Sequence, residues 1–464
     1  MLAFQSNSNN AWIFNGTNGN LNNGNNRINA YAARLFRASA SEVMDVFMRA
    51  LIPLPIIYRW FRKTIARKRR KCSMVEYNRQ GPRHLREMCL RLNGRYYIPS
   101  DYTWFPIFYP KLREVIAPDA DDRTPQTLWC ETVRPYVEKH LDPNSYSCRV
   151  GRGALRAVDQ FIEYYLEESE GGTVPCDFIS IDQKSFFLHL DRRMLMKLYE
   201  PIIRDNFEPQ MADFLIWLGN ILYLSCPAEH LNRICPVSEA ADLPDYKRME
   251  KLPWWQGVAI GNLPSQMAGN IVSTLYLNIL RYYGFTRFVH YSDDIRTVIR
   301  HDRLQQFLRI VMPTLRREES RHNMEMNEGK FYCQPSYYGI KMFGYFLKTK
   351  GSEIILVPDR RIIRNFSSKL SYYEFRGKSK RWRLWNKEHF RDCVNSYLGI
   401  FRHCQSEDLR AEIAARIQHG PWNDMIRLKP DNTACAIRKA YTRKEYYRRH
   451  NRELRRYINQ QIPS

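Results

Sequence analysis

The sequence lacks the features that mark zinc-binding, disulfide-bonded and membrane-spanning proteins. Its 11 cysteines are scattered singly, with no C-x-x-C pair and no Cys/His spacing suited to zinc. The most apolar stretch, residues 214–224, is interrupted by Gly219 and Asn220 and is shorter than the ~20 residues that a transmembrane helix requires. The N-terminus is polar and does not resemble a signal peptide. These absences predict a soluble, cytoplasmic protein with free thiols.

Acidic residues are few relative to basic ones in this chain of 464 residues. Lys and Arg number 72 against 48 Asp and Glu, so the formal net charge at pH 7 is +24. Residues 351–464 hold 25 basic and 12 acidic residues, which is 13 of the 24 excess charges. A polyanion is therefore the expected partner. The chain is 44% hydrophobic, which is enough to bury a large core in two to four subdomains.

The first 71 residues contain two segments of biased composition. Residues 7–29 include eleven Asn in 23 positions, so we expect residues 1–35 to be disordered. After a predicted helix from about Ser39 to Pro53, the run 59–71 has eight basic residues and no acid. That run is either a solvated face or a phosphate contact.

Short β-type runs alternate with amphipathic segments between about 100 and 350, which indicates an α+β core. Residues 178–181, 288–291 and 295–299 read as strands. The pattern of residues 304–312 predicts a helix that Pro313 stops or kinks. The chain after Pro358 is basic, and its pattern predicts mostly helices.

Two adjacent acids lie between two of these runs. Asp293 and Asp294 would sit at a hairpin turn, where neighbouring carboxylates repel each other unless a divalent cation neutralises them. An isolated S-D-D sequence is more often an ordinary turn, but Asp182 ends the strand 178–181. Three carboxylates brought together would hold two Mg²⁺ ions, the arrangement that nucleotidyl transfer requires.

A third segment lies between these acids in the sequence. Residues 260–266 read I-G-N-L-P-S-Q and lead into a helical pattern. A turn of this composition lets main chain approach a nucleotide closely, with Ser265 and Gln266 offering hydrogen bonds. Alone it would be an ordinary junction between a loop and a helix.

Taken in order, these segments resemble the motifs of a reverse transcriptase. D-x-K-S-F-F at Asp182, I-G-N-L-x-S-Q at Ile260 and Y-S-D-D at Tyr291 resemble palm motifs, and Phe343-Gly344-Tyr345 resembles the element that supports the primer. Further matches are R-E-V-I-A at Arg113, D-R at 122–123, S-Y-S-C-R with G-R-G at 145–153, N-E-G-K ending at Lys330, and N-S-Y-L-G at 395–399. The match covers about 105 to 405.

The resemblance implies a right-hand polymerase fold, an α+β architecture with fingers, a palm of antiparallel sheet plus helices, and a helical thumb. Residues 36–175 would form the N-terminal helix, basic run and fingers. Residues 176–350 would form the palm, with a fingers insertion at about 200–258. Residues 351–464 would form the basic thumb and C-terminal tail.

The resemblance also implies roles for particular residues, some of which have a plainer structural alternative. Asp182, Asp293 and Asp294 would bind metal with the main-chain carbonyl of Gln183, and Lys330 would assist the departing pyrophosphate or be a surface lysine. Phe187 would exclude a 2′-hydroxyl or simply pack in the core. The nucleotide-binding group would be Arg113, Arg123, Phe186, Phe187, Ile260, Gly261, Ser265 and Gln266. The template- and primer-binding group would be Arg149, Arg152, Phe343, Gly344, Tyr345, Lys380, Arg381 and Arg383.

Within reverse transcriptases, I-G-N-x-x-S-Q resembles the enzymes of diversity-generating retroelements, which are bacterial or phage-encoded. These copy a template-repeat RNA into cDNA with errors at adenines, as part of mutagenic retrohoming. The Asn-rich segment resembles a translated template repeat, because Asn codons are rich in adenine. The expected partners are template RNA, the cDNA or primer, dNTPs and a small basic accessory variability determinant protein. A phage-defence or retron-type polymerase and a catalytically silent RNA-binding scaffold remain alternatives.

Overall fold

The computed structural model describes residues 3–4, 12–15, 20–23, 51–66, 72–79, 81–108, 111–225, 227–229 and 231–442. The helix predicted from about 39 to 53 falls mostly outside these residues, as does the basic tail after 442. Within residues 1–35, the structure describes a small sheet of three strands: β1 (Ala3–Phe4), β2 (Trp12–Asn15) and β3 (Asn20–Asn23).

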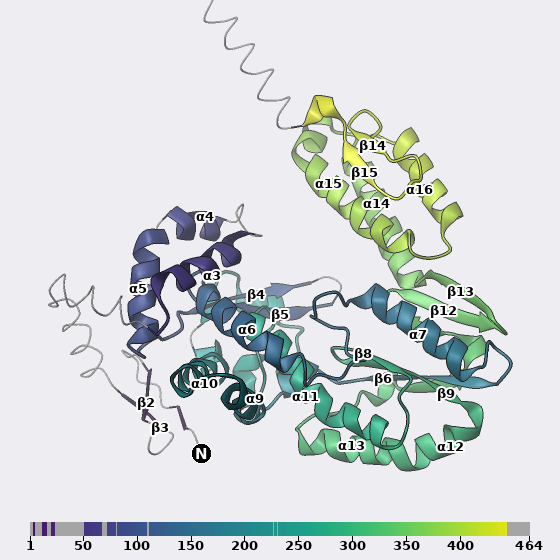
Figure 1. Cartoon of the computed structure of the whole chain (residues 1–464). Coiled ribbons are helices and arrows are strands. Elements are labelled where there is room, and N and C mark those ends of the chain that lie inside the picture. The colour runs from purple at the N-terminus through teal and green to yellow at the C-terminus, as the bar shows by residue number, and fades with distance from the viewer. Residues whose placement is uncertain are drawn as a thin grey trace, which may run out of the picture.

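A four-stranded antiparallel sheet with the order β10-β6-β9-β8 lies at the centre of the molecule (Figure 1). Its strands are β6 (Cys176–Asp182), β8 (Phe288–Tyr291), β9 (Asp294–Arg300) and β10 (Tyr332–Pro335). The three strands predicted from the sequence are β6, β8 and β9. All seven residues of β6 are buried, and its apolar side chains alternate between two cores.

The larger core lies on one face of this sheet. Ile179 and Ile181 of β6 and Ile295 of β9 belong to it, together with apolar side chains of the N-terminal helices between residues 54 and 93 and of five further helices. Those five helices are α6 (Arg123–Val137), α9 (Arg192–Asn206), α10 (Pro209–Leu224), α11 (Leu263–Tyr282) and α13 (Met312–Arg321). The short helix α8 (Phe186–His189) follows β6 and contributes Phe186 to the same core.

A smaller core covers the opposite face. Phe178 and Val298 of the sheet pack there with Phe161, which lies on α7 (Ala154–Glu168). Residues of a second antiparallel sheet complete this core: β11 (Ile340–Met342), β12 (Tyr345–Lys350) and β13 (Glu353–Pro358). A sheet buried on both faces fixes the strand register, because a slip by one residue would exchange the two cores.

The N-terminal part combines three helices with a three-stranded sheet. The helices are α3 (Leu54–Ala66), α4 (Cys72–Arg79) and α5 (Gly81–Asn93). The strands are β4 (Tyr102–Ile107), β5 (Arg113–Ala117) and β7 (Leu231–Arg233). Because β7 pairs parallel to β4, the segment predicted as an insertion at about 200–258 returns to this sheet.

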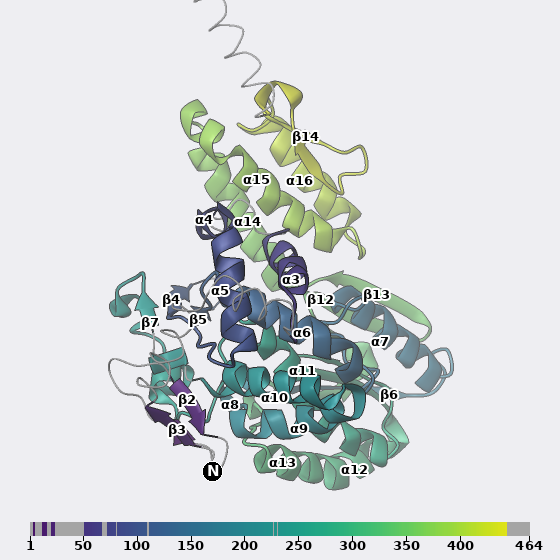
Figure 2. The same cartoon turned by 60° about the vertical axis from the view of Figure 1, so that its left-hand side comes forward.

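The chain after Pro358 is mainly helical, as predicted. It forms α14 (Arg360–Arg376), α15 (Lys380–Phe401) and α16 (Glu407–His419). A hairpin of β14 (Ile426–Leu428) and β15 (Cys435–Ile437) packs on these helices and was not predicted. In Figures 1 and 2 this unit stands at one end of the molecule, and the sheet β11–β12–β13 lies between it and the central sheet.

The helix predicted for 304–312 contains a π-helical segment. Residues 304–306 form α12 (Leu304–Gln306), Phe307–Val311 are π-helical, and α13 begins at Met312 with Pro313 near its N-terminus. Proline has no N–H to donate, so it disturbs the hydrogen-bond ladder and fits best in a first helical turn. Pro313 therefore does not end the helical path.

The predicted α+β class, with an antiparallel sheet, covering helices and a helical C-terminal unit, is confirmed. In the part of the chain described above, no helix combines the length and the apolarity needed to cross a membrane.

Candidate functional site

The three predicted metal-binding aspartates lie together at one end of the central sheet. In the register of β6 and β9, Asp182 is directly opposite Asp294, so their side chains share one face. Asp293 occupies the turn between β8 and β9, where Ser292 adopts a left-handed conformation (φ 61°). The main-chain N–H of Gln183 donates to the carbonyl of Asp293 at 2.8 Å, which ties this turn to the end of β6.

Two of these carboxylates form ion pairs with cationic side chains. Lys330 Nζ lies 2.6 Å from each carboxylate oxygen of Asp182, which is buried, while Lys330 is half-exposed. Arg296 donates to Asp294 Oδ1 at 2.9 Å and to the carbonyl of Ile181 at 3.1 Å. The site is therefore partly neutralised by the chain's own cations.

The segment that carries Lys330 is fastened to the end of β6. Asn327 donates from its main-chain N–H to the carbonyl of Asp182 at 2.7 Å and from Nδ2 to Asp182 Oδ1 at 3.0 Å. The N–H of Lys184 donates to the carbonyl of Glu325 at 2.8 Å. These bonds fix the spacing between the acid and its cation. Asn327 was not singled out from the sequence, although it begins the N-E-G-K segment.

Among the residues that the structure describes, no cation forms an ion pair with the third carboxylate, that of Asp293. Burial raises its pKa to about 6, with further contributions from the negative charges of Asp294 and Asp182. Oxygen donors with uncompensated negative charge are what Mg²⁺ binds in proteins. As the side chains stand, however, no group of three or more His, Cys, Asp or Glu within the described ranges is arranged to hold a metal ion. A divalent ion would have to replace Lys330 at Asp182.

A buried histidine supports the turn and was missed by sequence reasoning. The ring of His290 lies between Ser145 Oγ, 2.9 Å from Nδ1, and the carbonyl of Ser292, 2.7 Å from Nε2. Because a carbonyl only accepts, Nε2 carries the proton and Nδ1 accepts from Ser145. Burial lowers the pKa of His290 to about 4, so this neutral form persists. The only sequence signal was a histidine within an otherwise apolar strand.

Gln183 follows Asp182 and has a second buried contact that the sequence did not reveal. Its Nε2 donates to Glu319 Oε1 on α13 at 2.5 Å. Burial raises the pKa of Glu319 to about 7. This bond fastens the residue after Asp182 to the helix that underlies the sheet.

The structure brings three segments of the predicted nucleotide-binding group together. The N–H of Ile116 on β5 donates to the carbonyl of Ile260, and Gly261 (φ 115°) passes close to Val115 on the same strand. Phe186 and Phe187 lie against Gly269 of α11, where a Cβ would come within 2.9 Å of the Phe186 ring. The 260–266 loop therefore lies against β5, and the helix that follows it lies against the segment after β6.

Individual members of this group differ in exposure. Phe186 is buried and Phe187 is half-buried, while Gln266 and Arg113 are exposed. Ser265 is buried and donates to the carbonyl of Ala259 at 2.7 Å, so its hydroxyl supports the loop.

Arg123 and Lys111, two basic residues of the N-terminal part, have different charged neighbours. Burial lowers the pKa of Arg123, against the opposing effect of Asp119 and Asp122. The charge of Lys330 lowers the pKa of Lys111, with further contributions from burial and from Arg361 and Arg113, whereas Asp182 raises it. Lys111 therefore lies among several cations beside the site, and it was not singled out from the sequence.

Arg149 and Arg152 of the predicted template-binding group lie near each other but differ in what they contact. Arg149 is paired with Glu138 at 2.6 Å and donates to the carbonyls of Asp142 and Ser145, so it supports the loop that contacts His290. Arg152 is exposed and stacks over the ring of Tyr146 with 5.2 Å to the centroid. Arg152 is thus the member of this pair that solvent, or a ligand, can reach.

The segment resembling the primer-support element contacts the Y-S-D-D turn. The rings of Phe343 and Tyr291 are 4.9 Å apart, and Phe343 and Gly344 both have positive φ. Tyr345 is buried and donates to the carbonyl of Ile400 at 3.2 Å. Phe343 and Gly344 therefore lie beside the carboxylates, and Tyr345 links them to α15.

The predicted basic group of the C-terminal unit is split between surface and interior. Lys380 and Arg381 are exposed at the start of α15. Arg383 is largely buried and is bound to the carbonyl of Pro421 and to the carboxylate of Asp424. These three residues lie far from the carboxylates along the chain, and Figure 1 places their helix in the unit beyond β12 and β13.

No protein-family model matches this chain, and no curated protein matches it. Among solved structures, it is similar to apo telomerase from Candida tropicalis truncated from its C-terminal domain. That likeness has a TM-score of 0.40 and 10% identity, over 55% of this chain and 54% of the telomerase chain. It is also similar to telomerase from Candida albicans in complex with a TWJ fragment of telomeric RNA, with a TM-score of 0.41 and 10% identity, over 69% of this chain and 55% of that one. The chain spans about half the length of these telomerase chains.

Proposed function

We propose that this protein is an RNA-directed DNA polymerase, a reverse transcriptase that joins deoxynucleotides to a primer by two-metal nucleotidyl transfer. The observation that carries the proposal is the register of the central sheet, which sets Asp182 opposite Asp294 with Asp293 on the adjoining turn. Three acids from distant parts of the chain share one edge and are buried or half-buried there. A scaffold protein gains nothing from such repulsion.

The residues that would hold two Mg²⁺ ions are Asp182, Asp293, Asp294 and the main-chain carbonyl of Gln183. All are oxygen donors. Burial raises the pKa of Asp293, and the negative charges of Asp294 and Asp182, which a cation would offset, raise it further. When bound, the ions would activate a primer 3′-hydroxyl and neutralise the leaving pyrophosphate.

The chain's own residues would carry out the remaining tasks. Lys330, half-exposed and fixed by the segment that Asn327 anchors, neutralises Asp182 in the free protein and would turn to the pyrophosphate when nucleotide is present. Arg113, Arg123 and Lys111 would attract the triphosphate, because guanidinium and ammonium groups bind phosphate. Phe187 would lie under the sugar and exclude a 2′-hydroxyl.

We assign the parts of the fold accordingly. Helices α3–α6 with the sheet β4–β5–β7 would be the fingers, including the insertion at about 200–258 that returns through β7. The central sheet with its helices, within 176–350, would be the palm, and α14–α16 the thumb. The exposed Lys380, Arg381 and Arg152 would contact template and primer.

Within reverse transcriptases, we propose the diversity-generating retroelement type. The support is the I-G-N-L-P-S-Q segment, which borders the nucleotide site through the contact of Ile260 with β5, and the Asn-rich residues 7–29. The partners would be a template-repeat RNA and a small basic accessory protein. cDNA with errors concentrated at template adenines is the expected product.

One observation favours a second candidate, a catalytically silent RNA-binding scaffold. Lys330 occupies both oxygens of Asp182 and Arg296 holds Asp294, so two carboxylates are neutralised without a metal. In a scaffold these pairs would be permanent.

A primer-extension assay tests the proposal against this alternative. Purified protein with an RNA template, a DNA primer, dNTPs and Mg²⁺ should extend the primer, and chelation should abolish extension. Asp293→Asn/Asp294→Asn should lower the rate by at least about a thousandfold, since metal charge stabilisation supplies several kcal/mol. The control is Asp302→Asn, an exposed acid just after β9. Undiminished extension in the double variant would support the scaffold, and sequencing of the product would test the bias at adenines.

A further inference from the structure

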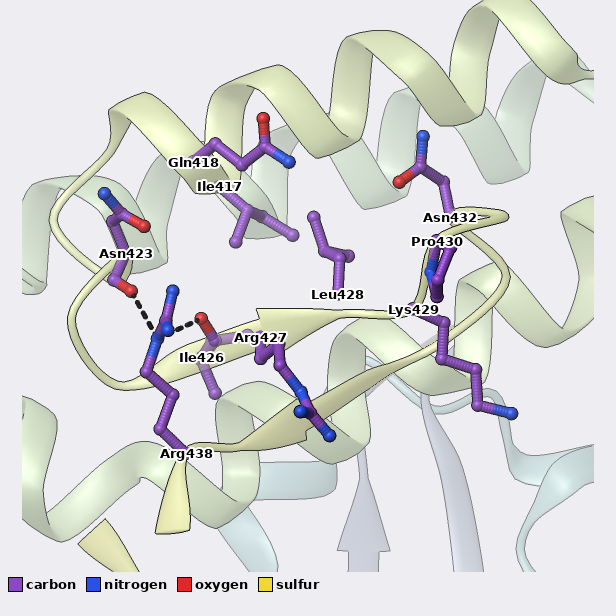
Figure 3. A pocket seen from close by; sticks show the side chains of 10 residues that line it. All are labelled: Ile417, Gln418, Asn423, Ile426, Arg427, Leu428, Lys429, Pro430, Asn432 and Arg438. Atoms are coloured by element: carbon purple, nitrogen blue, oxygen red, sulfur yellow. Dashed lines mark hydrogen bonds between the residues drawn. The ribbon is translucent and has the colours of Figure 1, made fainter. Parts of the chain in front are cut away.

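A second candidate binding site lies at the far end of the C-terminal unit, away from the carboxylates. A cavity of about 240 Å³ opens between α16 and the β14–β15 hairpin (Figure 3). Ile417 on α16 and Leu428 on β14 project toward one another across it, and Figure 3 shows Gln418 and Asn432 above and beside them. The cavity is separate from the exposed start of α15, where Lys380 and Arg381 lie.

The lining of this cavity is cationic and amide-rich. Three of its residues are the exposed cations Arg427, Lys429 and Arg438, and none is acidic. Three more carry side-chain amides, and the apolar lining is aliphatic. The amides belong to Gln418, Asn423 and Asn432, and the aliphatic residues are Ile417, Ile426, Leu428 and Pro430.

The three cations differ in whether their side chains form hydrogen bonds or ion pairs with other residues of the protein. Arg438 donates from Nε to the carbonyls of Asn423 and Ile426, at 3.0 and 3.2 Å, which fixes its guanidinium at the mouth of the cavity. Within the described residues, Arg427 and Lys429 make no side-chain hydrogen bond or ion pair. The nearby acid Asp431 interacts with Lys429 through charge, but its carboxylate accepts from Thr433 and it does not line the cavity. Figure 3 shows the charged ends of Arg427 and Lys429 directed away from Ile417 and Leu428, so these two cations are available to an anionic group at the rim of the cavity.

We propose that this cavity binds an unpaired nucleotide of the template RNA, outside the polymerase site. The cations would bind the backbone phosphates and the amides would bind the edge of the base, which the aliphatic side chains would contact. The volume is below the ~300–1,000 Å³ of most small-molecule sites, which suits one flat base. The sequence that follows supplies more positive charge, since 443–456 holds seven basic residues and two acids.

The inference rests on the proposed function for the identity of the RNA, but it makes a separate prediction about binding. The cations should set the salt dependence of RNA affinity, whereas the amides should set any preference among bases. A merely charged surface would show the first effect without the second.

The test uses the full chain and fluorescently labelled single-stranded homopolymer RNAs of 12 nucleotides. Arg427→Gln/Lys429→Gln should weaken binding of the preferred RNA about tenfold and make the slope of log K against log salt shallower by about 1.4, since each phosphate contact on a single strand contributes ~0.7. Gln418→Ala/Asn423→Ala should keep the slope and reduce the preference among the four RNAs. The matched control, Arg402→Gln/Lys439→Gln, removes two exposed cations that do not line the cavity.

Crosslinking locates the contact independently. RNA containing 4-thiouridine should crosslink to peptides within 417–438, and the Arg427→Gln/Lys429→Gln variant should lose that crosslink. The inference would be overturned if the control pair weakened binding equally, or if no crosslinks formed within 417–438. It would also be overturned if poly-glutamate competed as tightly as RNA, because the cavity would then bind an acidic protein segment instead. Extension of a pre-annealed primer should stay unchanged in all these variants. Failure of the wild type to extend would count against the proposed polymerase alone.

Discussion

At the scale of single residues, His290 sets the geometry of the Y-S-D-D turn from the face of the sheet opposite Asp294. Its Nε2–H donates to the carbonyl of Ser292, and Ser145 fixes the ring from the other side. His290→Leu should lower the primer-extension rate about tenfold or more, because a small misplacement of a reacting group is costly. His290→Gln, whose amide can still donate to Ser292, should restore much of the rate. Equal losses in both variants, measured at equal folded fraction, would show that the bond to Ser292 is unimportant.

Asp122 gives a pH dependence of stability that can be separated from catalysis. It is fully buried, accepts from Tyr97 Oη at 2.7 Å and from the N–H of Ser100 at 2.9 Å, and burial raises its pKa from 3.8 to about 7. The folded state therefore holds this proton more tightly than the unfolded chain, so stability falls as the pH rises through this window. The upper limit of that loss is about 4 kcal/mol.

The variant Asp122→Asn removes this titration. Compared with the wild type, it should gain about 2 to 4 kcal/mol in free energy of unfolding between about pH 4 and pH 8. Urea unfolding across this range is the measurement, with Asp119→Asn, an exposed neighbour, as the control. Parallel curves for wild type and Asp122→Asn would show that Asp122 ionises normally.

The residues of the candidate site divide into those that the sequence could indicate and those that it could not. Asp182, Asp293 and Asp294 lie at the ends of apolar runs, so local pattern pointed to them. His290 and Glu319 are recognisable only when segments far apart in the chain meet. The internal pairing of Arg149 and Arg383 with acids likewise depends on tertiary contacts, which periodicity does not encode.

At the scale of elements, strands whose side chains face two cores were the most predictable part. β6, β8 and β9 each contain apolar residues that face the cores, although polar residues such as His290 and Arg296 interrupt them. The parallel pairing of β7 with β4 joins residues more than 120 positions apart, and nothing in either short strand specifies it. The β14–β15 hairpin was missed because its strands have only three residues each.

One glycine shows how tightly two elements meet behind the central sheet. Gly172 has φ +92°, and a Cβ there would collide with the main chain of Gly351 and Ser352 in the turn between β12 and β13. Tyr165 donates to the carbonyl of Gly351 at 2.8 Å and holds the same contact. This contact joins α7 and the loop between α7 and β6 to the hairpin that leads to the C-terminal unit.

Gly172→Ala should therefore lower the free energy of unfolding by about 2 kcal/mol or more, through backbone strain together with the clash. The control Gly171→Ala has a similar φ of +71° but open space around its Cβ, so it should lose only about 1 kcal/mol from strain. Denaturant unfolding of both variants measures the difference. Similar losses in free energy of unfolding for the two variants would mean that the loop with Gly172 and the turn with Gly351 move apart easily.

At the scale of the whole molecule, residues 351–464 carry 13 of the 24 excess positive charges, and the described part of them forms one end of the molecule (Figure 1). The unit α14–α16 stands at that end, joined to the central sheet through β11–β13 (Figure 2). Large exposed aromatic side chains accompany the charge there, since Phe375 is 69% and Trp385 78% exposed. Positive charge combined with exposed aromatic rings suits nucleic acid, because the cations can contact phosphates while the rings contact bases.

The basic group at the start of α15 should separate into binding and structural residues. Lys380→Gln/Arg381→Gln should weaken binding of an RNA–DNA duplex and make the slope of log K against log salt shallower by about 1.8, with melting temperature unchanged, because both side chains are exposed. Arg383→Gln should instead lower the free energy of unfolding by about 1 to 3 kcal/mol, because it leaves Asp424 and the carbonyl of Pro421 without their largely buried partner. Binding per folded molecule should then be unaffected. Suppose instead that Arg383→Gln changed the salt slope and left the free energy of unfolding unchanged. The Arg383–Asp424 ion pair would then have to open when the duplex binds, and Arg383 would count as a binding residue and not as a structural one.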